Sequence, residues 1–78
     1  MTYFDKVRFL HKTLNQQLND NRLKSVQLLL THYDGHMAFK FTCLENSKRK
    51  DKVKALCDQY RENMILVKET KTTLTYVI

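Results

Sequence analysis

The residues of this sequence with the clearest chemical potential form a basic run in its second half. Five of the fourteen lysines and arginines fall within positions 48–54, where Asp51 is the only acidic residue. Ammonium and guanidinium groups bind phosphate oxygens through charge-assisted hydrogen bonds. We therefore expect this run to contact phosphates. Its members are Lys48, Arg49, Lys50, Lys52 and Lys54.

The same run is expected to occupy the first turns of a helix. Asn46 and Ser47 precede it, and both residue types favour the N-cap position of a helix predicted over about 47–63. Cations are unfavourable at a helix N-terminus because the macrodipole is positive there. Free N–H groups at a helix start, together with cations, bind anions. The alternative is a solvated basic turn that binds no partner.

A second basic set lies near the N-terminus and comprises Lys6, Arg8 and Lys12. Arg8 and Lys12 are four residues apart, so they share one face of a helix. If both helices pack on one side of a sheet, Arg8 and Lys12 are expected to extend the phosphate-binding footprint. The competing interpretation is an ordinary polar helix face.

Other side chains argue against catalysis and metal binding. His32 and His36 flank a predicted turn and fall on opposite faces of the hairpin. Cys43 and Cys57 fit the core, and no Cys-x-x-Cys or His-x-x-x-His spacing indicates zinc. One glycine in the chain leaves no glycine-rich phosphate loop. We predict a protein that is not an enzyme and that needs no cofactor or metal.

Length and composition indicate one small domain over residues 1–78. The net charge of +6 attracts polyanions, and 42% hydrophobic residues suffice for one core. Two cysteines do not make a disulfide framework, and no apolar run approaches the roughly 20 residues of a membrane span. The first residues lack the apolar core of a signal peptide. We expect a soluble cytoplasmic protein, and its Lys/Asn/Thr-rich composition suggests a viral, phage or mobile-element origin.

Hydrophobic periodicity predicts the elements that position these residues. A helix over Thr2 to about Asp20 carries an apolar stripe at three- and four-residue spacing. Two strands, 24–33 and 36–45, flank Asp34-Gly35, the strongest short hairpin signal. Residues 64–78 are rich in β-branched and aromatic residues and form either one long strand or two. The predicted fold is α+β with order α-β-β-α-β, or α-β-β-α-β-β if residues 64–78 form two strands. Two helices are expected to cover one face of a small antiparallel sheet.

Alternation along the strands separates core aromatics from exposed ones. Phe39 and Phe41 fall on the apolar side of their strand and are predicted to be buried. Tyr33 points away from the face of Val26 and Leu28. An exposed aromatic ring of this kind can stack on a base.

Two functions follow from these patterns. The first is a small nucleic-acid-binding or accessory protein, for DNA or RNA, whose contacts position rather than specify. The second is a protein-interaction module, an inhibitor or adaptor, that docks by its basic surface or by a free edge strand within 65–78. The same edge would serve a homodimer, since edge strands are templates for pairing.

Overall fold

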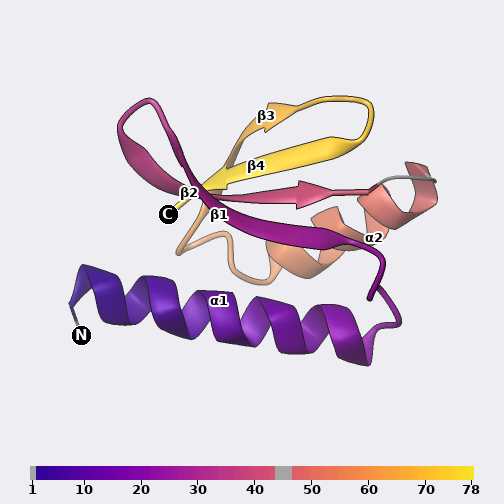
Figure 1. The fold of residues 1–78 in the computed structure, drawn as a ribbon, viewed down its shortest axis with the longest axis horizontal. Helices are drawn as coiled ribbons and strands as arrows, with labels where there is room; N and C mark the ends of the chain where they lie inside the picture. Colours follow the sequence, from indigo (N-terminus) through magenta and orange to yellow (C-terminus); the bar gives the residue numbers. More distant parts are fainter. Residues whose placement is uncertain (1, 44–46) are drawn as a thin grey trace.

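The computed structural model describes residues 2–43 and 47–78, which form six elements (Figure 1). The predicted α+β class is confirmed. The chain has the order α-β-β-α-β-β, because residues 64–78 form two strands. The elements are α1 (Tyr3–Asp20), β1 (Gln27–Tyr33), β2 (His36–Thr42), α2 (Ser47–Asp58), β3 (Ile65–Glu69) and β4 (Thr73–Val77).

The four strands form one antiparallel sheet in the order β1-β2-β4-β3. β4 therefore lies inside the sheet, and the edges are β1 and β3. The prediction of a free edge within 65–78 is correct for Ile65–Glu69 and wrong for Thr73–Val77. β4 is interior because it pairs with β2 on one side and with β3 on the other.

The hairpin prediction at Asp34-Gly35 is confirmed. Tyr33 lies opposite His36, and His32 lies opposite Met37. Asp34 and Gly35 have φ of 51° and 80°, the left-handed values that a type I′ turn needs at both central positions. The two histidines accordingly belong to opposite faces of the sheet.

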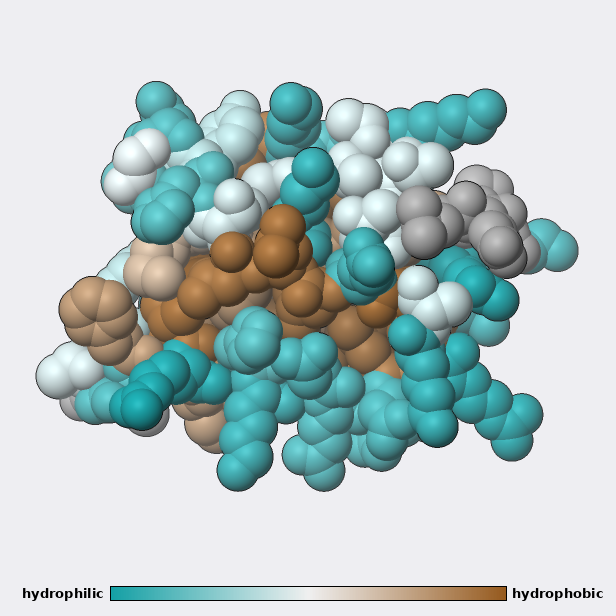
Figure 2. All heavy atoms as spheres, viewed as in Figure 1, coloured by the Kyte–Doolittle hydropathy of each residue, from teal (hydrophilic) through white to brown (hydrophobic). Residues whose placement is uncertain are grey.

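Both helices cover the same face of the sheet (Figure 1). Apolar side chains from helices and strands meet in one core, visible as a band between hydrophilic surfaces in Figure 2. Phe39, Phe41 and Leu74 are fully buried, as the strand alternation predicts for the two phenylalanines. Leu30 lies on the same face, opposite Phe39, yet it is 40% exposed because β1 is an edge strand.

Thr2 is the N-cap residue of α1. The Thr2 hydroxyl accepts a hydrogen bond from the Asp5 N–H at 3.2 Å, which satisfies one of the free donors of the first turn. Val7, Leu10, Leu14 and Leu18 form the buried stripe. Phe4 has the spacing of this stripe, three residues before Val7, but it is 69% exposed.

α1 ends in a Schellman motif with an arginine at its left-handed position. The Leu23 N–H bonds to the Leu18 carbonyl at 2.7 Å, and the Arg22 N–H bonds to the Asn19 carbonyl at 3.3 Å. Arg22 has φ of 60°, which glycine adopts freely and a residue with a Cβ adopts at a cost of about 1–2 kcal/mol.

We expect Arg22→Gly to raise the free energy of unfolding by about 0.5–1 kcal/mol, because it removes this cost while adding some unfolded-state entropy. Urea denaturation followed by circular dichroism measures the change. Lys24→Gly is the matched control, since Lys24 is not among the residues with positive φ. An equal gain in both variants would contradict the assignment of strain to Arg22.

α2 is shorter than the predicted helix over 47–63. It ends at Asp58, and the next N–H groups bond three residues back, as in Tyr60 to Cys57 at 2.9 Å and Asn63 to Tyr60 at 2.8 Å. These tighter turns end the α-helical ladder. Ser47 begins α2 as predicted, and Asn46 lies outside the described residues. In the part of the chain that the structure describes, no helix has the length and apolar character to cross a membrane.

Candidate nucleic-acid interface

Two of the five predicted phosphate ligands bind a carboxylate of the protein itself. Lys50 Nζ lies 2.7 Å from one oxygen of Glu69, and Lys54 Nζ lies 3.0 Å from the other. Lys50 also donates to the Thr70 carbonyl at 3.1 Å, and its side chain is only 14% exposed. Hydrogen bonds from these two lysines lower the pKa of Glu69. Lys50 and Lys54 therefore fasten α2 to β3 and its following turn.

Of the other three residues of the run, Arg49 and Lys52 lie toward the loop between α1 and β1. Arg49 donates a hydrogen bond to the Ser25 hydroxyl in this loop, which brings the first turns of α2 against residues 21–25. Lys48 and Lys52 are exposed on the surface of α2. The loop carries two further exposed cations, Arg22 and Lys24.

These cations from two segments form one surface, which we call the basic end: Arg22, Lys24, Lys48, Arg49 and Lys52. The sequence shows the charges of Arg22 and Lys24, but it does not show that the loop packs against α2. Asp51 is the only acidic residue among positions 47–57. Against these five cations, positions 20–25 and 47–57 contain two acidic residues, Asp20 and Asp51, so the basic end carries a net positive charge.

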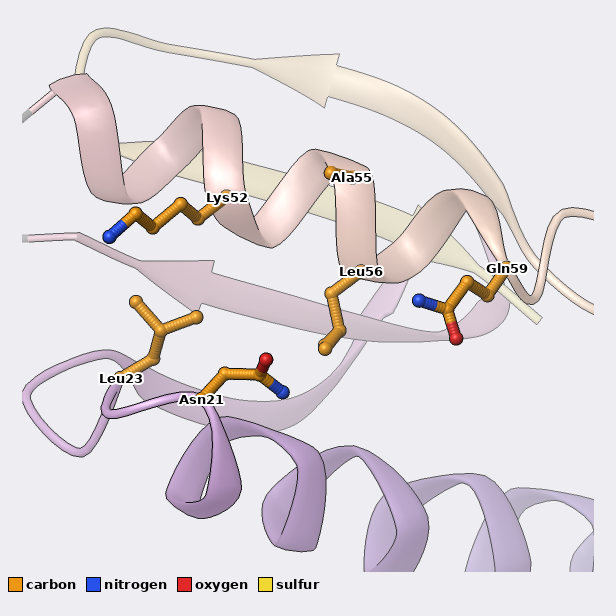
Figure 3. A pocket seen from close by; sticks show the side chains of 6 residues that line it. All are labelled: Asn21, Leu23, Lys52, Ala55, Leu56 and Gln59. Carbon is orange, nitrogen blue, oxygen red and sulfur yellow. The ribbon is translucent and has the colours of Figure 1, made fainter.

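A hollow of about 370 Å³ opens between this loop and α2. Asn21 and Leu23 line it from the loop side, and the side chains of Lys52, Leu56 and Gln59 extend toward them from α2 (Figure 3). The amides of Asn21 and Gln59 offer both hydrogen-bond donors and acceptors. The Lys52 ammonium supplies charge at the same opening.

Arg8 and Lys12 do not join the basic end. Lys6 and Leu10 share a surface hollow with Tyr60 and Asn63, so this flank of α1 faces the segment after α2. At 100° per residue, Arg8 and Lys12 lie on the opposite flank of α1. Both are exposed there. Arg8 and Lys12 therefore do not form one continuous surface with the basic run 48–54, a possibility that the sequence leaves open.

The cysteines have the surroundings of core residues. Cys43 and Cys57 are free thiols and are 2% and 1% exposed. Burial raises the pKa of Cys57 to about 12, and burial also raises that of Cys43, although Lys50 and Arg49 oppose the shift. Both thiols stay protonated at neutral pH, the unreactive form. Within residues 2–43 and 47–78, no group of three histidine, cysteine or acidic side chains is placed to hold a metal ion.

Comparisons with protein-family models, curated proteins and solved structures found no match to this chain.

Proposed function

We propose that this protein binds nucleic acid and that the basic end contacts the phosphate backbone. The supporting observation is the contact between Arg49 and Ser25, which places the cations of the first turns of α2 beside the loop that carries Arg22 and Lys24. Lys52 of α2 also lines the hollow between the two segments. Such a surface attracts polyanions and releases their counterions on binding. Lys50 and Lys54 are engaged with Glu69, so they contribute to the shape of the site rather than to the phosphate contacts.

Phosphate contacts of this kind hold a backbone without reading its sequence. Affinity should therefore fall linearly with salt in a log–log plot, with a slope of about 0.9 per phosphate for duplex DNA. We expect similar affinities for duplexes of unrelated sequence. Fluorescence anisotropy of labelled DNA and RNA across a salt titration measures both properties. No binding at about 50 mM salt, where these contacts are strong, would overturn the proposal.

We expect the double charge reversal Lys24→Glu/Lys52→Glu to lower duplex affinity more than tenfold at about 50 mM salt and to reduce the salt slope by about two. The matched control is Lys6→Glu/Arg61→Glu, which changes the net charge equally at positions away from the basic end. An equal loss in both variants would show that net charge, and not this surface, determines binding. Arg8→Glu/Lys12→Glu tests in the same way whether the opposite flank of α1 extends the footprint.

A further inference from the structure

The second face of the sheet is not covered by either helix (Figure 1). Residues directly opposite each other in an antiparallel pair point to the same face. Lys40 pairs with Thr75, and Thr75 pairs with Lys68, so these residues form a row across β2, β4 and β3. The opposite face is the core face, because Phe41 pairs with Leu74 there. The row therefore belongs to the uncovered face.

Two lysines flank a buried threonine in this row. Neighbouring strands lie about 4.8 Å apart, which separates the backbones of Lys40 and Lys68 by roughly 10 Å. Thr75 between them is 5% exposed. A hollow of about 210 Å³ lies over the row, and seven of its eight lining residues carry a hydroxyl or an ammonium group. The lining residues are Thr31, His32, Tyr33, Lys40, Lys68, Thr70, Thr73 and Thr75.

No carboxylate balances these lysines on the sheet. The four strands contain one acidic residue, Glu69, which pairs with the core residue Leu74 and binds the lysines of α2 on the covered side. Two like charges facing one hollow repel each other, and an anion placed between them removes the repulsion. Threonine hydroxyls can donate hydrogen bonds to the oxygens of that anion.

Exposed apolar and aromatic side chains border the hollow. Leu29 lies directly beside Lys40 in the register and is 58% exposed, and Tyr33 lines the hollow itself. Unpaired bases stack on such rings, whereas the bases of a duplex are already stacked and paired. A second copy of this chain would bring lysines against lysines on this face. A single strand offers both the anion and the free base.

We propose that the uncovered face of the sheet binds single-stranded nucleic acid, with a phosphate held between Lys40 and Lys68 over Thr75 and a base stacked on Tyr33. This inference rests on the proposed function, since it assigns a second surface to the same ligand class. The basic end then holds phosphates of either form of nucleic acid, and the sheet face favours the unpaired form.

The test compares a labelled 15-nucleotide oligothymidylate with a labelled duplex. We expect Lys40→Gln/Lys68→Gln to lower oligothymidylate affinity about tenfold and its salt slope by about 0.7, the value for one single-strand phosphate. Duplex affinity should change no more than in the matched control Lys6→Gln/Arg61→Gln, which has the same net charge. Tyr33→Ala should independently lower oligothymidylate affinity about tenfold, because one stacked base is lost.

The outcomes separate the two proposals. If the wild type binds nucleic acid but Lys40→Gln/Lys68→Gln matches its control on oligothymidylate, the sheet site is overturned and the proposed function stands. If single strand and duplex lose affinity equally, the face is a general phosphate contact and its preference for single strands is overturned. A wild type that binds neither probe overturns both, and tight binding of an acidic protein at this face would then identify the other class of partner.

Discussion

Phe39→Ala is expected to cost about 3–5 kcal/mol of unfolding free energy, the range for removing a buried phenylalanine ring. Phe39 is fully buried, and its ring stacks on His11 of α1 with centroids 5.9 Å apart. It therefore joins the sheet to the helix below it. At about 0.05–0.15 kcal/mol per residue, a chain of this length is stable by roughly 4–12 kcal/mol, so a large part of the total is lost.

Urea denaturation followed by far-ultraviolet circular dichroism measures this loss. Phe9→Ala is the matched control, because Phe9 lies on α1 but is 57% exposed, and its removal should change stability by no more than about 0.5 kcal/mol. A loss below about 1 kcal/mol for Phe39→Ala would contradict the packing described for the core.

The second large effect is a loss of stability at alkaline pH. Burial raises the pKa of Cys57 from 9.0 to about 12, and a hydrogen bond from Tyr76 partly opposes this shift. Burial, followed by the neighbouring Cys57, raises the pKa of the Tyr76 phenol above its ordinary value of 10.0. Both groups are neutral when protonated, so the folded state keeps protons that the unfolded chain has already released.

The sign follows from proton linkage. Each group contributes fully to the free energy of unfolding below the pKa that it has in the unfolded chain, and this contribution is lost as the pH rises toward the pKa in the folded state. The loss begins near pH 9 for Cys57 and near pH 10 for Tyr76. Each group removes at most about 1.4 kcal/mol of unfolding free energy per pH unit within its window. We expect the urea midpoint to fall steeply above pH 9.

Tyr76→Phe tests this expectation because it keeps the ring and removes the titrating hydroxyl. The variant should lose less stability than the wild type between pH 9.5 and about 11.5, a range set by the linkage relation. Tyr33→Phe, at an exposed phenol, is the control and should follow the wild type. Identical pH profiles for Tyr76→Phe and the wild type would show that the buried phenol does not control alkaline unfolding.

Local patterns predicted most of the fold. Asp34-Gly35 determines the β1–β2 register because few residue pairs adopt two successive positive φ values, and the stripe from Val7 to Leu18 identifies the covered side of α1. The exposure of a strand residue also depends on whether its strand lies at the edge or in the interior of the sheet, and this could not be predicted from the sequence. Leu30 has the same alternation as a core residue, yet only the sheet order reveals that its strand is an edge.

The candidate site could be predicted only in part, because it depends on contacts between segments that are far apart in the sequence. The density of cations in 48–54 is plain in the sequence, but Glu69 lies fifteen residues beyond Lys54, and its pairing with Lys50 and Lys54 requires β3 to lie beside α2. The sequence likewise does not reveal that the Ser25 hydroxyl accepts a hydrogen bond from Arg49. Lys40 and Lys68 are neighbours of one threonine only because β4 enters the sheet between β2 and β3.

The strand order also determines the order in which the strands can pair during folding. β1–β2 and β3–β4 are hairpins between adjacent segments, whose closure takes microseconds, whereas the β2–β4 pairing joins residues as distant as Ala38 and Val77. Closing that long loop has an entropic cost before any contact offsets it. We therefore expect the slow step of folding to be the pairing of β2 with β4, the seam that joins the two hairpins. Buried residues on both sides of that seam, Phe41 and Leu74 among them, should contribute most to the folding transition state.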